Sequence, residues 1–110
     1  MDDLTQRIEA SMKEWNLYRN PDITVKDVAK ELATNRLYVS RAINTSFGMS
    51  FTSYINRKRI EYSIQLMREH PNMSLENVAA ESGFVSKKAF FLKFRDVMGD
   101  SPRAYMKKNP

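Results

Sequence analysis

The sequence predicts an all-α protein of about seven helices. Apolar residues recur at helical spacing along the chain, and no run of useful length alternates apolar and polar residues as a half-buried strand would. The chain also repeats itself: residues 23–55 and 73–106 share one pattern, with Ala29 matching Ala79 at an offset of 50 and Gly48 matching Gly99 at 51. The one-residue difference falls in a turn.

The composition narrows the class of protein. The chain has 110 residues, 42% hydrophobic and 28% charged, so it can bury a core and is not a disordered tail. It has no cysteine, which excludes disulfides, thiolate zinc sites and cysteine nucleophiles. It has no apolar run of membrane-spanning length and no secretory signal, so we expect a soluble, cytoplasmic protein.

The charge is distributed unevenly. Residues 1–22 contain three basic and five acidic residues, net −2, whereas residues 23–110 contain fifteen basic and eight acidic residues, net +7. An excess of basic charge favours an anionic partner such as nucleic acid, although many basic proteins merely have solvated surfaces.

The first helix is predicted over residues 3–18, where Leu4, Ile8, Met12 and Trp15 recur on one face and are expected in the core. The stretch "RNPD" ends it. In the first repeat, Thr24 caps a short helix, helped by an acid three residues later. The turn "ATN" follows, and Asn35 caps the next helix.

A long helix links the two repeats, from the cap Ser50 to the stop at Pro71. Its candidate core residues are Phe51, Tyr54, Ile55, Ile60, Ile64 and Met67. The expected division of the chain is therefore 1–49, an N-terminal helix with the first repeat; 50–70, the linking helix; and 71–110, the second repeat with a C-terminal helix.

The second repeat has its own start and stop signals. Ser74 and Ser86 can each cap a helix, and Gly83 between them can adopt the positive φ that ends one. The last helix is predicted at "SPRAYM", with Ser101 as its cap and Pro102 at its first position. Each repeat thus reads as two helices joined by a tight turn.

Two helix-turn-helix units joined by a long helix, with "ESGFVSKKAFFLKFRDVMGDSPRAY" in the second, resemble the DNA-binding domain of the AraC/XylS family of bacterial transcription regulators. The resemblance covers Ile8 to Met106 and includes the linking-helix segment "RIEYSIQLM". It implies a homeodomain-like fold and sequence-specific binding to double-stranded DNA, with two recognition helices in successive major grooves. Two units fixed by a stiff helix must lie about 34 Å apart to meet the same groove twice.

In the first recognition helix, Val39, Ile43 and Phe47 repeat at helical spacing and should face the core. Arg41 falls where the family contacts bases, and a guanidinium can bond guanine O6 and N7 as a fork; a phosphate contact is the alternative. Leu37 either meets a thymine methyl group or packs within the domain. The residues expected to face outward are Arg36, Leu37, Ser40, Arg41 and Asn44.

The second recognition helix departs from the family pattern. Phe90 and Phe94 take the core positions, but Phe91 and Leu92 stand where the family usually has polar residues that contact bases. Either apolar contacts replace hydrogen bonds in this groove, or the helix sits shallowly and its lysines hold phosphates, or the two residues bury against another domain or chain. We favour mostly phosphate binding. The candidates for base contact here are Lys87, Lys88, Phe91 and Leu92.

The remaining candidates are expected to contact phosphate. Arg57, Lys58 and Arg59 cannot share one helix face, since adjacent residues are about 100° apart, so at least one should meet the DNA. Arg59 could instead form an internal ion pair. His70 is expected to be a capping or surface residue, because a lone imidazole makes no metal site. The phosphate-contacting set is Thr24, Arg57, Lys58, Ser74, Ser86 and Arg95.

The sequence offers no support for an enzyme: it has no nucleophile with a base, no metal-ligand spacing and no Gly-rich phosphate loop, so no cofactor or metal is expected. A protein-interaction module that lost DNA binding is the serious rival. The start of the chain and its end at "KKNP" favour a fragment of a larger regulator. RNA polymerase and a separate sensor or dimerisation domain are then further candidate partners.

Overall fold

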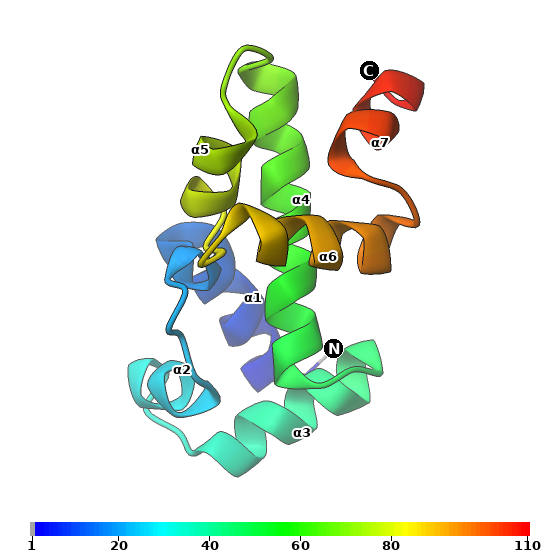
Figure 1. Cartoon of the computed structure of the whole chain (residues 1–110). Coiled ribbons are helices and arrows are strands. Elements are labelled where there is room, and N and C mark those ends of the chain that lie inside the picture. The colour runs from blue at the N-terminus through cyan, green and yellow to red at the C-terminus, as the bar shows by residue number, and fades with distance from the viewer. Residues whose placement is uncertain (1) are drawn as a thin grey trace. The chain divides into compact units, whose positions relative to one another are not determined.

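The computed structural model describes residues 2–110, and within that range every regular element is a helix (Figure 1). The chain divides into two compact units, Met1–Ile55 and Asn56–Pro110. The boundary falls inside the long helix α4 (Phe51–Glu69), so α4 contributes its start to the first unit and the rest to the second. The predicted all-α class and the order of the helices are confirmed.

The first unit contains α1 (Asp3–Trp15), a short 3-10 helix η1 (Leu17–Arg19), α2 (Val25–Glu31) and α3 (Arg36–Phe47). Its core is formed by apolar residues from all the α-helices of the unit. A partly buried polar contact joins α1 to α3, because the hydroxyls of Thr5 and Ser46 lie 2.9 Å apart. The buried apolar residues of this unit are Ile8, Met12, Tyr18, Val28, Ala29, Val39, Ala42, Ile43, Tyr54 and Ile55.

The predicted caps of the first unit form. The Thr24 hydroxyl accepts a hydrogen bond from the Asp27 N–H at 3.1 Å, and the Asp27 carboxylate accepts one from the Thr24 N–H at 3.0 Å. Hydrogen bonding to the Asp27 carboxylate by the Thr24 side chain and by the Thr24 backbone N–H favours its ionised form, so the pKa of Asp27 is lowered. Asn35 begins α3 by accepting from the Tyr38 N–H at 3.0 Å. These bonds satisfy N–H groups that a helix start would otherwise leave unpaired.

The prediction that Trp15 lies in the core is wrong, since its side chain is 63% exposed. Helical periodicity predicts a face only while the helix continues, and α1 ends at Trp15. Asn16 then takes a left-handed conformation, with φ 50°, and redirects the chain. Tyr18 of η1 is buried instead.

The second unit contains most of α4 together with α5 (Leu75–Glu81), α6 (Lys87–Met98) and α7 (Pro102–Lys108), as Figure 1 shows. Its core is aromatic at the centre. The ring of Phe90 lies 5.3 Å from that of Phe84 and 5.7 Å from that of Phe94, and Phe94 lies 5.5 Å from Tyr105. The other buried members of this core are Ile60, Ile64, Met67, Val78 and Ala79.

The two tight turns have the same backbone design. Ala33 and Gly83, which match at an offset of 50, both have positive φ, 54° and 98°. The next residue in each turn donates its N–H to the matched alanine carbonyl: Thr34 to Ala29 at 2.9 Å, and Phe84 to Ala79 at 3.0 Å. The caps that follow match at 51, so the extra residue in the second turn is Val85.

These turns predict opposite effects of exchanging glycine and alanine. A left-handed conformation costs an L-residue about 1–2 kcal/mol, which exceeds the extra chain entropy that glycine loses on folding. Ala33→Gly should therefore raise the free energy of unfolding by about 0.5 kcal/mol, and Gly83→Ala should lower it by about 1 kcal/mol or more. Urea unfolding followed by circular dichroism measures both. Two shifts of the same sign would contradict the shared design.

Candidate nucleic-acid interface

The outward face of α3 is polar with one apolar end. Leu37, Arg41 and Asn44 stand at positions i, i+4 and i+7 and are all exposed, so they form one stripe along the helix. Arg36 is exposed beside this stripe, and Ser40 is half-buried. The core positions Val39 and Ile43 on the opposite face are fully buried. The expected facing of α3 is confirmed for its exposed and fully buried residues, whereas Ser40, expected outward, and Phe47, expected in the core, are both half-buried.

Tyr38 is an exposed residue of α3 that sequence reasoning missed. Its side chain is 53% exposed, although it precedes the buried Val39. Together with Arg41 and Asp2 it borders a surface depression of about 270 Å³. Asp2 belongs to the cap of α1, where its carboxylate accepts from the Thr5 N–H at 2.7 Å, and this bond lowers the pKa of Asp2. The exposed aromatic ring thus lies beside the predicted base reader.

The outward stripe of α6 has the opposite chemistry. Lys88, Leu92 and Arg95 stand at i, i+4 and i+7 and are exposed, with Leu92 at 60%. At an offset of 51 they match the stripe of α3, whose order is apolar, cationic and amide. The stripe of α6 is cationic, apolar and cationic. The two helices therefore present different groups from equivalent positions.

Phe91 does not face outward as expected. Its ring meets the ring of Phe90 edge-on at 5.9 Å, and its side chain is half-buried against the core of the second unit. It also lines a pocket with Leu75 of α5 and Pro102 of α7. Because α5 and α7 both have apolar surface on that side of α6, much of the Phe91 ring is buried against them. Phe91 is thus less available for base contact than Leu92.

The two lysines at the start of α6 differ. The Lys87 ammonium lies 3.2 Å from the Glu76 carboxylate and 5.4 Å from the centre of the Phe91 ring. The Glu76 backbone N–H and the Lys87 side chain together lower the pKa of the Glu76 carboxyl. For Lys88 the described residues provide no ion-pair partner within 4.0 Å. Lys88 is the cation of this pair that is available to an anionic ligand.

Val85 is a second exposed residue that sequence reasoning missed. Its side chain is 77% exposed and lies immediately before Ser86, the residue that caps α6. In the sequence, the change of offset between the two repeats indicates an inserted residue in this turn. That change could not show whether Phe84 or Val85 would enter the core.

The three capping candidates for phosphate contact, Thr24, Ser74 and Ser86, are exposed at the starts of α2, α5 and α6. Each side-chain oxygen accepts from a backbone N–H, and its hydroxyl hydrogen can donate to a phosphate oxygen. The N-terminus of a helix favours anions, because its first backbone N–H groups point away from the helix and are free to donate.

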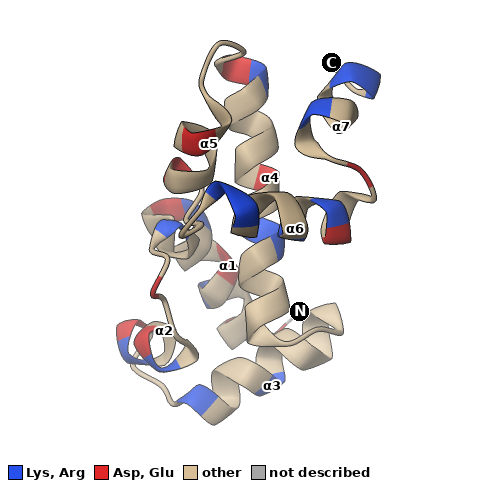
Figure 2. Cartoon of the chain, viewed as in Figure 1, with Lys and Arg blue, Asp and Glu red and all other residues tan. Residues whose placement is uncertain are grey.

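The basic candidates differ in exposure. Arg57 and Arg95 are exposed, whereas Lys58 is half-buried. Arg59 was expected to meet either phosphate or an internal acid. It donates to the Asn56 side chain at 3.3 Å, and its guanidinium lies 5.8 Å from the centre of the Phe84 ring. Burial lowers the pKa of Arg59. Figure 2 shows the basic residues at the starts of α3 and α6 and along α7.

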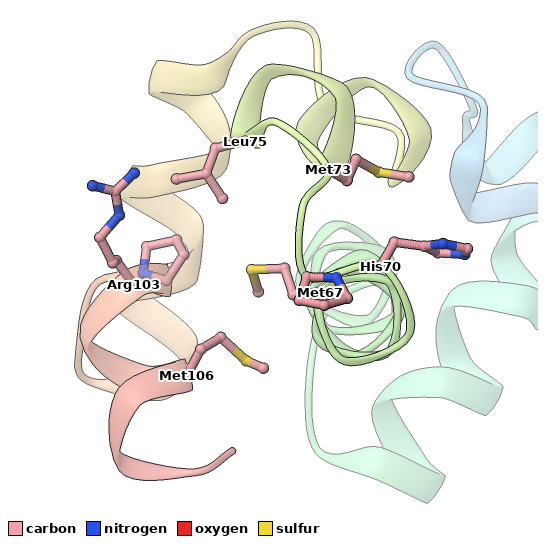
Figure 3. A pocket seen from close by; sticks show the side chains of 8 residues that line it. Met67, His70, Met73, Leu75, Arg103 and Met106 are labelled. Atoms are coloured by element: carbon pink, nitrogen blue, oxygen red, sulfur yellow. The ribbon is translucent and has the colours of Figure 1, made fainter.

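A separate pocket of about 180 Å³ lies between the end of α4, the start of α5 and α7 (Figure 3). Methionines 67, 73 and 106 line it with Leu75, and His70 and Arg103 stand at its edge. His70 is exposed, as predicted for a surface residue.

Among residues 2–110 there is no group of three His, Cys, Asp or Glu side chains that could hold a metal ion. Over the same range no helix is both long and apolar enough to cross a membrane.

Two helix-turn-helix units with exposed, partly basic recognition helices define a DNA-binding protein of the double helix-turn-helix class. A family model described as a helix-turn-helix domain matches residues 28–108. The chain belongs to this family, the AraC-type DNA-binding domains of bacterial transcription regulators, which are not enzymes.

Known proteins agree with this assignment. The TCP pilus virulence regulatory protein of Vibrio cholerae is 35% identical over 80 residues, 73% of this chain and 28% of that protein. The C-terminal domain of AraT, a response regulator from Geobacillus stearothermophilus, has the same fold, with a TM-score of 0.85 at 23% identity over 98% of this chain and 87% of that one. The DNA-binding domain of AdpA, solved with a target DNA, gives a TM-score of 0.78 at 25% identity over 94% and 90%. The chain therefore spans less than a third of the V. cholerae relative.

Proposed function

We propose that this chain recognises specific double-stranded DNA sequences by placing α3 and α6 in successive major grooves, about 34 Å apart along the duplex. The matched, exposed stripes on the two helices support this proposal, because each follows the same turn and stands opposite a buried core face. The AdpA domain, which resembles this chain, was solved with DNA. The proposed setting is the bacterial cytoplasm, with RNA polymerase and a sensor or dimerisation domain as further partners.

The two helices contribute unequally in this proposal. Arg41 can discriminate guanine with a forked pair of hydrogen bonds, and Asn44 can pair with adenine in the same way. The α6 stripe has no equivalent in its centre, where Leu92 replaces the arginine. The half-site read by α3 should therefore be sharply specified and the one read by α6 should be degenerate and A/T-rich.

Selection of bound sequences from a random DNA pool tests this function. We expect one conserved block and, about one helical turn away, a weakly conserved A/T-rich block. Two equally sharp blocks would show that α6 reads bases by hydrogen bonds after all. If no sequence is enriched, the chain does not act as a specific reader.

Replacing Arg41 by alanine should weaken binding to the preferred site by about 1–3 kcal/mol and relax one base position, because one forked contact is lost. Lys88→Ala is the matched control and should weaken all sequences by similar factors, since a phosphate contact carries no base information. Titrations on the selected site and on random duplex measure both. Equal losses on the two DNAs for both variants would refute this division of roles.

A protein-interaction module that has lost DNA binding is the second candidate. The exposure of Leu92 and Val85 favours it, because both could meet an apolar protein surface. Phe91 supports it less than the sequence suggested, since its ring packs against the core. Binding to random duplex DNA at low salt separates the two candidates. Only a DNA-binding protein should bind such a duplex, through electrostatic contacts between its basic side chains and the phosphates.

A further inference from the structure

The exposed apolar residues of the second helix-turn-helix unit point to one kind of base. We propose that Val85 and Leu92 recognise thymine through its C5-methyl group in the major groove. This inference rests on the proposed placement of α6 in the groove. Beyond the proposed function, the inference names thymine as the base and Val85 as a second residue that contacts it.

Val85 is exposed because of how the second turn is built. The inserted residue leaves two adjacent apolar side chains, Phe84 and Val85, to be accommodated between α5 and α6. Phe84 packs 5.3 Å from Phe90 and is only 7% exposed, so the core position is occupied. Val85 remains 77% exposed beside the cap of α6. The N-terminal residues of a recognition helix are those that contact base edges.

Leu92 stands between two cations. Lys88 precedes it by four residues and Arg95 follows it by three, so all three share the outward stripe of α6. The stripe spans roughly 10 Å at the rise of an α-helix, which is close to the major groove width of about 12 Å. The cations can reach the phosphates at its two edges while Leu92 faces the base pairs.

The chemistry of the groove selects the ligand. Thymine is the only one of the four bases that presents a methyl group on its major-groove edge, whereas guanine, adenine and cytosine are distinguished there by hydrogen-bonding atoms. Isobutyl and isopropyl side chains cannot pair with those atoms and would leave them without water. They gain free energy only by burying a methyl group.

The charge of α6 favours nucleic acid over a protein as the occupant of this face. The helix contains Lys87, Lys88, Lys93 and Arg95 but only one acid, Asp96. Lys87 and Lys93 are partly balanced, by Glu76 at 3.2 Å and Asp96 at 3.8 Å. Lys88, on the same stripe as Leu92, has no such partner among the described residues.

The test is to replace thymine by deoxyuridine in the block read by α6, which removes only the methyl group. Each methyl that Val85 or Leu92 covers should contribute about fourfold in affinity, so the substituted duplex should bind about four- to fifteenfold more weakly. Changing the same thymines to cytosine should also weaken binding, and 5-methylcytosine should recover part of the loss because it restores the methyl group.

Two variants connect the effect to these side chains. Val85→Ser and Leu92→Asn replace the two apolar side chains by polar ones that carry no methyl group. Each should reduce the ratio between thymine and uracil duplexes, and the double variant should bring it close to one. Trp15→Ser changes another exposed apolar residue and should leave the ratio unchanged.

The outcomes separate the two levels of the proposal. Equal affinity of the unmodified protein for thymine and uracil duplexes, with selection for a sequence retained, overturns methyl recognition but leaves the proposed function. Failure to bind any duplex overturns the function itself. A Leu92→Asn variant that changes the mass in solution but not the thymine-to-uracil ratio would assign this face to a protein contact and overturn the inference.

Discussion

Raising the salt concentration from 50 to 200 mM should weaken binding to duplex DNA about 1,000-fold. If about six basic side chains neutralise phosphates, the logarithm of affinity falls with the logarithm of salt at a slope of roughly −5, because counterions are released. Exposed cations on the recognition helices and on α4, such as Lys88, Arg95 and Arg57, are the main contributors in this picture. Fluorescence anisotropy at several salt concentrations measures the slope.

Single variants sharpen the salt test. Lys88→Ala and Arg57→Ala should each make the slope shallower by about one unit. Lys108→Ala is the control and should leave it unchanged, since its ammonium lies 2.8 Å from the Asp100 carboxylate. That pair raises the pKa of Lys108 and lowers the pKa of Asp100. A slope near zero for the unmodified protein would refute electrostatic DNA binding.

Phe94→Ala should lower the free energy of unfolding by about 3–5 kcal/mol, the range for removing a buried aromatic side chain. The Phe94 ring is completely buried and lies edge-on to Phe90 at 5.7 Å and to Tyr105 at 5.5 Å. Its loss leaves a cavity where α6 and α7 meet the core of the second unit. Urea unfolding measures the change, and a loss below about 1 kcal/mol would contradict the packing described.

Leu92→Arg is the matched surface change, two residues from Phe94. Because Leu92 is 60% exposed, this substitution should change the free energy of unfolding by about 0.5 kcal/mol or less. It should also add a guanine preference to the weak block, since an arginine fork then stands at the position that matches Arg41. Unfolding of the second unit would mean that Leu92 belongs to the core.

The positions of the helices could be predicted because their signals are local. Each capping side chain bonds to an N–H group three residues ahead, as Thr24, Asn35, Ser74, Ser86 and Ser101 do. A cap therefore acts whatever the rest of the chain does. The repeat added a second local signal, since the same apolar spacing and the same turn occur twice.

The outward face of α3 could also be predicted, because the periodicity of Val39 and Ile43 leaves the opposite face exposed. The same reasoning was less successful for α6. There, three of five consecutive residues are phenylalanine, and periodicity alone cannot rank adjacent apolar residues. Contacts with α5 and α7 drew Phe91 partly inward, and Leu92 remained on the surface.

Competition for space in the core decided what the local signals left open. Phe84 rather than Val85 was buried because its ring reaches Phe90. Trp15 was exposed because the helix that placed it on an apolar face ended there, and Tyr18 lay further along the redirected chain. Caps and periodicity act over a few residues and so determined the helices, but burial is shared among all helices of a unit. Only the tertiary structure could therefore decide which apolar side chains remain on the surface.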